Sequence, residues 1–270
     1  MPPLQTAPAD TTPSTGGADA SAQTTPQAGQ NTPAFSPLYQ QIKQLILQSL
    51  ENGEWKPGDT IPSELELAAR YRVSQGTVRK AIDELAADNL LVRRQGKGTF
   101  VATHAEQQVQ YRFLRLQPDN GERPTPGERQ VIDVRRMRAP ADVARALGLR
   151  ASEPVLQVRR VLSFDAKPTI LEEVWLPGGP FKGLTQEVLS AHQGAMYALF
   201  ETRYGVRMVR AEEKIKAVAA DAATANHLDT ATGTPLLYVE RLAYTYNDIP
   251  MEWRRGWYRT TTHHYANTLN

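Results

Sequence analysis

Residues 62–101, PSELELAARYRVSQGTVRKAIDELAADNLLVRRQGKGTFV, contain the densest set of helix caps, turns and apolar periodicity in the chain. Ser63 is followed three residues later by Glu66, a capping box that starts a helix because each side chain can satisfy an unpaired backbone amide. Ser74 is a second candidate cap, placed just before another run of helical periodicity. The apolar stripe of that second helix consists of Val78, Ile82, Leu85 and Ala86. The spacing therefore predicts two short helices joined by a tight turn.

A glycine-rich hairpin follows this pair of helices. Residues 90–94 and 99–102 are typical of two short strands around the turn Gln95–Gly98. Upstream, Ser36-Pro37 is a cap followed by a proline at the first helical position, and apolar residues then recur at helical spacing over Leu38–Leu50. Three helices followed by a basic-tipped hairpin are the pattern of a winged helix-turn-helix.

The exposed side of the third helix carries side chains that suit DNA. Arginine can bind guanine through two hydrogen bonds, glutamine can bind adenine, and threonine can contact a phosphate or a thymine methyl group. The alternative is a basic solvated helix that never meets DNA, because most runs of charge are solvated faces. The full order of elements favours DNA binding. The predicted contacts are Ser63, Arg70, Ser74, Gln75, Gly76, Thr77, Arg79 and Lys80 in the helices, and Gln95, Gly96 and Lys97 in the hairpin.

Length and composition bound the rest of the chain. Its 270 residues carry a net charge of +2 and no cysteine, which argues against disulfides, thiolate metal sites and a cysteine nucleophile. No apolar stretch approaches the ~20 residues of a membrane span, and the N-terminus lacks signal-peptide features, so we expect a cytoplasmic protein. Composition divides the chain into a disordered tail (1–34), the winged helix-turn-helix (35–103), a linker (104–110) and a C-terminal domain (111–270).

The C-terminal domain contains an internal repeat. Residues Ala141–Leu162 align with Ala222–Ala243, so that Arg160 meets Arg241. Each copy predicts a short helix, a spacer and a long β-hairpin. Antiparallel hairpins with helices packed on one side would give an α+β domain whose halves are related by an approximate two-fold. A cleft between such halves is a natural ligand site.

One pair of charged residues in the first hairpin is predicted to face inward. Arg160 and Glu172 lie equally far from the hairpin centre at Ala166, so they should be directly opposite each other. Each shares its strand face with apolar residues. A buried charge needs a partner or a ligand, because an isolated one costs several kcal/mol. The spacing leaves both possibilities open, a cross-strand ion pair or a ligand site.

Residues 58–101, GDTIPSELELAARYRVSQGTVRKAIDELAADNLLVRRQGKGTFV, resemble the N-terminal domain of the GntR family of bacterial transcription regulators nearly end to end. Arg79 and the GKG of the hairpin match the family pattern. The family usually has an arginine in place of Leu65, and often one in place of Gln75, at positions that contact DNA. These departures concern the operator sequence and not the fold.

The region from Gln110 to Tyr265 resembles the UTRA effector-binding domain of the HutC subfamily, whose fold is similar to chorismate lyase. The match rests on VRRVLSFDAKPTILEEVWLP, GAMY and PMEWRRGWY. Two residues depart from members that bind sugar phosphates, since Leu162 stands in place of a second arginine and Ala195 in place of a serine. Such a pocket should hold a small carboxylate or similar metabolite. The effector contacts that the resemblance implies are Arg160, Glu172, Tyr197, Glu252, Tyr258, Phe113 and Arg115.

We therefore predict a homodimeric, ligand-responsive transcription regulator, more specifically a repressor that binds a palindromic operator, with no metal or cofactor. One alternative is a chorismate-lyase-like enzyme fused to a DNA-binding domain, but the sequence has no G-x-S-x-G, H-E-x-x-H or Walker-type motif. A second is a DNA-binding dimer without an effector. A pyridoxal-dependent regulator would need several hundred residues more than the ~160 that remain.

Overall fold

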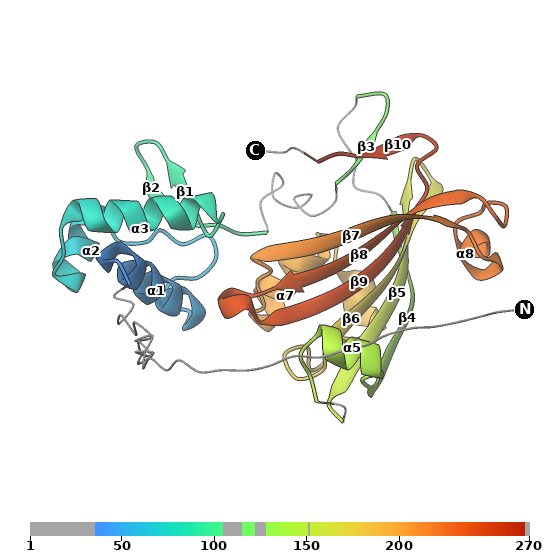
Figure 1. Ribbon diagram of the computed structural model, residues 1–270, viewed down its shortest axis with the longest axis horizontal. Coiled ribbons are helices and arrows are strands. Elements are labelled where there is room, and N and C mark those ends of the chain that lie inside the picture. Colours follow the sequence, from blue (N-terminus) through green and yellow to red (C-terminus); the bar gives the residue numbers. More distant parts are fainter. Residues whose placement is uncertain (1–35, 105–114, 122–127, 151, 268–270) are drawn as a thin grey trace, which may run out of the picture. The chain divides into compact units, whose positions relative to one another are not determined.

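The computed structural model describes residues 36–104, 115–121, 128–150 and 152–267 (Figure 1). The described residues from Pro37 onward belong to one compact unit. The tail predicted to be disordered lies outside the described residues, as do positions 105–110 of the predicted linker. The predicted linker's first residue, His104, is described and is buried.

The N-terminal domain is a bundle of three helices followed by a two-stranded hairpin. Its elements are α1 (Leu38–Glu51), α2 (Glu64–Tyr71), α3 (Gln75–Ala87), β1 (Leu91–Arg94) and β2 (Gly98–Val101). The capping box of Ser63 and Glu66 is present, and the Ser74 hydroxyl accepts a hydrogen bond from the backbone N–H of Thr77 at the start of α3. Val78, Ile82 and Leu85 of the predicted apolar stripe are buried in a core that includes Ile46 and Leu67, whereas Ala86 is only partly buried. The predicted winged helix-turn-helix is therefore confirmed.

The C-terminal domain is built on a six-stranded antiparallel sheet with the order β4-β5-β6-β9-β8-β7. The β5–β6 and β8–β9 hairpins are the two copies of the sequence repeat, and they meet at the centre of the sheet through β6 and β9. A separate pair of strands joins β3 (Leu116–Pro118) to β10 (His263–Tyr265). The sheet strands are β4 (Glu128–Arg138), β5 (Pro154–Phe164), β6 (Lys167–Pro177), β7 (Arg210–Ala219), β8 (Pro235–Tyr244) and β9 (Pro250–Tyr258).

Helices cover both faces of this sheet, and not one side only as the repeat had suggested (Figure 1). Val158 and Leu156 pack with α7 on one face, whereas Val155 packs with α5 and Val161 with α8 on the other. The physical reason is that β5 has apolar side chains of both parities, so both of its faces must be buried. The short elements are α5 (Ala141–Ala146), α6 (Gln186–Ala191), α7 (Met196–Tyr204), α8 (Ala222–His227) and the 3-10 turn η1 (Tyr246–Asp248).

A glycine in β9 makes room for a buried aromatic ring. A Cβ atom added to Gly256 would lie 2.5 Å from Cε2 of Tyr258. Tyr258 is 2% exposed and packs against Ile170 and Val239, so its ring has little room to move aside. The close approach of this ring to the strand therefore requires glycine at position 256.

We predict that Gly256→Ala lowers the free energy of unfolding by about 1–3 kcal/mol, the usual cost of overpacking a filled core. Urea unfolding of the full chain, followed by tryptophan fluorescence, measures the change. Gly179→Ala is the matched control, because a Cβ atom there meets nothing within 4 Å. Equal effects of the two substitutions would contradict the packing argument.

Candidate functional site

The outer face of α3 gathers the central set of predicted DNA contacts. Val78 and Ile82 are buried, which turns the opposite side of the helix toward solvent. At the start of α3 the hydroxyls of Ser74 and Thr77 lie 2.8 Å apart in a hydrogen bond. A helix N-terminus with free N–H groups and hydroxyls suits a phosphate. The exposed residues of this face are Gln75, Gly76, Arg79 and Lys80.

Glu64, the first residue of α2, binds several of these side chains and was not predicted as a site residue. Its carboxylate accepts hydrogen bonds from Gln75 Nε2 at 3.2 Å, from Arg79 Nε at 2.9 Å and from Arg93 Nη1 at 2.9 Å. Burial alone would raise the Glu64 pKa, but the hydrogen bonds from Arg79 and Arg93 outweigh it and lower the pKa. No sequence pattern marks Glu64, because these partners lie on other elements.

Two of the predicted cations, Arg70 and Lys80, make contacts within the helical bundle. Arg70 forms an ion pair with Glu54, and its guanidinium carbon lies 5.6 Å from the centroid of the Trp55 ring. Lys80 Nζ lies 3.8 Å from the centroid of the Tyr39 ring in α1. Lys80 thus connects α3 to α1, and Arg70 connects α2 to the segment between α1 and α2, so a phosphate would have to draw both side chains away from these partners.

The hairpin tip presents Gln95, Gly96 and Lys97, all of them exposed. Gly96 has a φ of 71°, a backbone conformation that favours glycine because other residues carry a Cβ atom. The Lys97 N–H closes the turn by donating to the Arg94 carbonyl at 2.9 Å. Ser63 is also exposed, but its hydroxyl and N–H are used in the capping box with Glu66.

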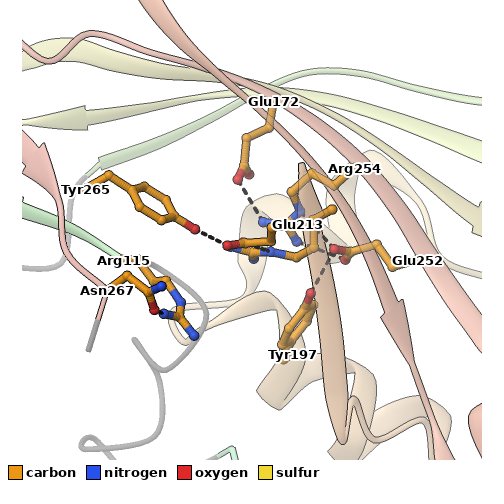
Figure 2. Close-up of polar contacts among 9 residues, drawn as sticks. Arg115, Glu172, Tyr197, Glu213, Glu252, Arg254, Tyr265 and Asn267 are labelled. Atoms are coloured by element: carbon orange, nitrogen blue, oxygen red, sulfur yellow. Dashed lines mark hydrogen bonds and ion pairs between the residues drawn. The ribbon is translucent and has the colours of Figure 1, made fainter. Parts of the chain in front are cut away.

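In the C-terminal domain, Arg160 and Glu172 are opposite each other as predicted, and both are buried. Arg160 Nε donates to Glu172 Oε2 at 2.6 Å. The other oxygen of Glu172 accepts from Arg254 Nη1 at 2.7 Å (Figure 2). Arg254 also binds both oxygens of Glu252, and the Tyr197 hydroxyl donates to Glu252 at 2.8 Å. The structure therefore joins four predicted effector contacts into one chain of ion pairs, with Arg254 as the link that the prediction lacked.

A second ion pair lies beside this chain on the same face of the sheet. Arg241 is 3% exposed and binds Glu213 of β7 at 2.7 Å through Nε. Glu213 also accepts a hydrogen bond from the Tyr265 hydroxyl (Figure 2). The repeat alignment, which places Arg241 with Arg160, was the available signal for Arg241. Arg254 and Glu213 carried no such signal.

The charges of this buried cluster balance. Burial would raise the Glu172 pKa, but the positive charges of Arg160 and Arg254 outweigh it and lower the pKa to about 2. Burial and the nearby Glu172 carboxylate raise the pKa of Tyr258 to about 12, so this phenol stays neutral. Every charge is thus partnered inside the domain. The three cations are Arg160, Arg241 and Arg254, and the three anions are Glu172, Glu213 and Glu252.

The remaining predicted effector contacts lie apart from the ion pairs or outside the description. Arg115 donates to Asn267 (Figure 2), and Phe113 falls outside the described residues. A small cavity of about 10 Å³ adjoins Arg160 and has room for roughly one water molecule. A molecule larger than water would enter this cavity only by displacing the side chains that line it. The cavity is lined by Arg129, Val131, Val158, Arg160, Leu189, His192 and Met196.

Residues directly after β2 are held by α7 and by the segment between α7 and β7. Glu201 accepts hydrogen bonds from the Thr103 hydroxyl and from the backbone N–H of His104. The His104 ring lies 2.8 Å from the Met208 carbonyl oxygen, and its centroid is 5.6 Å from that of Tyr197. One helix therefore contacts both the ion-pair chain, through Tyr197, and the end of the DNA-binding domain.

Arg207 makes a further connection to the end of α3. Its guanidinium donates to the carbonyls of Asn89 and Leu90 at 3.1 and 3.4 Å, and to the Tyr246 hydroxyl at 3.1 Å. Arg207 is 4% exposed.

Among the described residues, no helix is long and apolar enough to cross a membrane, and no cluster of metal-ligating side chains is found.

Two family models match the chain. The model described as "Bacterial regulatory proteins, gntR family" matches residues 38–101, and the model described as "UTRA domain" matches residues 127–264. The HTH-type transcriptional regulator Rv0792c of Mycobacterium tuberculosis is 34% identical over 226 residues, covering 82% of this chain and 80% of that protein. The HTH-type transcriptional repressor NagR of Bacillus subtilis is 29% identical over 239 residues, covering 87% and 96%.

Solved structures show the same relationship. The ligand-binding domain of a GntR-family transcriptional regulator from Bordetella bronchiseptica has 51% sequence identity to the chain and a TM-score of 0.58. The alignment covers 59% of this chain and 99% of the Bordetella domain. The C-terminal domain thus shares its fold with a domain described as ligand-binding.

We predict that Glu172→Gln destabilises the C-terminal domain in a pH-dependent way. The Glu172 pKa is lowered in the fold, to about 2 from an ordinary value of 4.5, so its stabilisation is complete above pH 4.5 and is lost as the pH falls toward 2. Wild type and variant should differ by about 3 kcal/mol at pH 7 and converge near pH 2. Urea unfolding across this pH range measures the difference. Glu187→Gln, at an exposed site, should show little effect, and a pH-independent difference for Glu172→Gln would contradict the electrostatic origin.

Proposed function

Because the chain belongs to the gntR family of bacterial regulatory proteins and carries a UTRA domain, we propose that it is a homodimeric repressor whose operator affinity is controlled by a small carboxylate metabolite. The predicted family and the predicted regulatory function are confirmed by these matches, and the relatives are transcription regulators and not enzymes. The chain is thus a DNA-binding regulator with an effector domain. Its dimeric state, its cytoplasmic location, its operator and its effector are the proposed parts.

On the DNA side, the proposal places α3 in the major groove and the β1–β2 hairpin beside it. The exposed face of α3 supports this placement, because Arg79 and Gln75 are residue types that hydrogen-bond to base edges. Ser74 and Thr77 would contact phosphate at the helix start, and Lys97 would contact it from the hairpin. A two-fold dimer would repeat these contacts in a second half-site, which makes a palindromic operator the natural target.

On the effector side, the arginines of the cluster support a carboxylate ligand. Arg160 and Arg254 already bind carboxylates in a buried site, and charge-assisted hydrogen bonds of this kind are strong. A carboxylate ligand could take the place of Glu172 or Glu252 beside one of these guanidinium groups and keep the buried cation paired, provided that the displaced glutamate is protonated or reaches solvent. A ligand without an acidic group could not make this exchange.

The observation that carries the proposed coupling is the position of α7. Tyr197 in its first turn binds Glu252 of the ion-pair chain, and Glu201, one turn later, binds Thr103 and His104. A ligand that takes Glu252 away from Tyr197 would shift this helix and the residues that follow β2. DNA and effector would then weaken each other's binding by the same factor, as linkage requires.

We predict that Arg79→Ala lowers affinity for the specific operator about 5- to 150-fold, the range expected for losing one good base contact. Stabilisation by the effector should stay unchanged, because Arg79 lies outside the C-terminal domain. An operator is first selected from random DNA, and affinity for it is then measured in a mobility-shift assay. The effector is identified from a panel of small carboxylates as a compound that raises the thermal unfolding temperature of the protein. If no compound that stabilises the protein changes its affinity for the operator, the proposed regulation is wrong.

We further predict that His104→Leu reduces the coupling. The substitution removes the hydrogen bond to the Met208 carbonyl and the ring contact with Tyr197, while no residue of the ion-pair chain changes. The ratio of operator affinities without and with effector should fall toward one, and effector affinity in the absence of DNA should stay the same. His264→Ala is the control, because His264 is exposed and pairs with Asp119. If His104→Leu keeps the full ratio of operator affinities, coupling does not pass through the contacts of His104.

A further inference from the structure

A single carboxylate, that of Glu64, contacts both residues of α3 that are proposed to read bases. Glu64 Oε2 accepts from Gln75 Nε2 at 3.2 Å, and it lies 2.9 Å from both Nε and Nη2 of Arg79. Its other oxygen accepts from Arg93 Nη1 of β1 at 2.9 Å. The Glu64 side chain is 13% exposed, whereas that of Arg79 is 56% exposed. The carboxylate is therefore much less accessible to solvent than the arginine that it binds.

The contact with Arg79 fixes the plane and direction of its guanidinium group. An arginine has five N–H donors in a rigid fork. Nε and one N–H of Nη2 face Glu64, which leaves both N–H groups of Nη1 and one of Nη2 directed away from the carboxylate. Two parallel N–H donors at the free end of the fork match the O6 and N7 acceptors of guanine. Arg79 is thus held in an orientation suited to guanine.

The contact with Gln75 fixes the direction of its amide group. An ionised carboxylate only accepts hydrogen bonds, so the amide nitrogen of Gln75 must face Glu64. One N–H and the carbonyl oxygen of the amide then remain for a base. A donor beside an acceptor is the pattern that glutamine uses to bind adenine through N7 and N6. Without Glu64 the amide could turn over and present the two groups in exchanged positions.

We infer that Glu64 is a positioning residue that sets base preference, favouring guanine at the position read by Arg79 and adenine at the position read by Gln75. This inference rests on the proposed placement of α3 in the major groove. The competing explanation is that Glu64 only ties α2, α3 and β1 together through ion pairs. The two explanations differ in what they predict for bases, because a purely structural ion pair affects all DNA sequences alike.

The experiment compares full-length wild type with Glu64→Gln and Glu64→Asp. For each protein, affinity is measured for the selected operator and for a set of variant half-sites. In these variants one position at a time is changed to each of the other three bases. Wild type should prefer guanine and adenine at two positions, by about tenfold or more over other bases. Glu64→Gln should lose most of this preference at both positions together, and keep its preferences elsewhere.

Glu64→Asp separates geometry from charge. Aspartate keeps the negative charge but is one methylene shorter, so it should hold the domain together while failing to orient Arg79 and Gln75. It should therefore lose discrimination at the same two positions. Glu84→Gln is the matched control, because Glu84 lies on α3 itself but pairs with Lys43 of α1. It should keep the full base preference of wild type.

Three outcomes would overturn the inference. Unchanged preferences in both Glu64 variants would show that Arg79 and Gln75 are oriented without the carboxylate. An equal loss of affinity for all sequences, with preferences intact, would leave Glu64 with a structural role only. A wild-type protein with no base preference would instead refute the proposed DNA recognition, on which the inference rests. Coupled loss at the two positions in both variants, with Glu84→Gln unaffected, supports it.

Discussion

A charged side chain that leaves water must keep a partner of opposite charge, and this constraint shapes both parts of the chain. In the C-terminal domain it joins Arg160, Glu172, Arg254 and Glu252 into a continuous chain across the centre of the sheet. In the DNA-binding domain the largely buried carboxylate of Glu64 pairs with Arg79 and Arg93 and also accepts a hydrogen bond from Gln75. Because each of these groups has several donors or acceptors, its partners determine its orientation.

In the proposed mechanism, the ion-pair chain makes the effector domain selective through an exchange of charged partners. Its charges balance, and the cavity beside Arg160 has room for roughly one water molecule, so a ligand that reaches these charges would exchange partners with them. An apolar core of the same volume could be just as stable, because buried ion pairs contribute little net stability. What the charged cluster adds is a set of contacts that a ligand of matching chemistry can take over. That property is what a sensor needs.

The position of α7 offers a way to transmit such an exchange from the ion-pair chain to the residues after β2. Tyr197 and Glu201 lie one helical turn apart, so they share a side of the helix. Tyr197 contacts the ion-pair chain and Glu201 contacts the residues after β2. A rigid helix that touches two sites can transmit a shift at one to the other, provided that both of its contact sets have discrete alternatives. In the proposed mechanism, exchange of the Glu252 partner would be such an alternative.

Local spacing was enough to predict the helices and hairpin of the DNA-binding domain and the two helix-hairpin repeats, because caps, turns and apolar periodicity act within a few residues of one another, whereas β3, β4 and β10 were not predicted. It placed Ser63, Ser74 and the Arg160–Glu172 pair correctly, since a cap and a hairpin register depend on local spacing alone. Which charges meet across elements depends on tertiary packing. Glu64 finds Arg79 and Arg93, and Glu172 finds Arg254, through packing of segments far apart in the chain. The second layer of helices was also decided at this level, because the sheet's two apolar faces both had to be covered. Periodicity records that a residue faces inward, but the identity of its neighbour there depends on the whole fold.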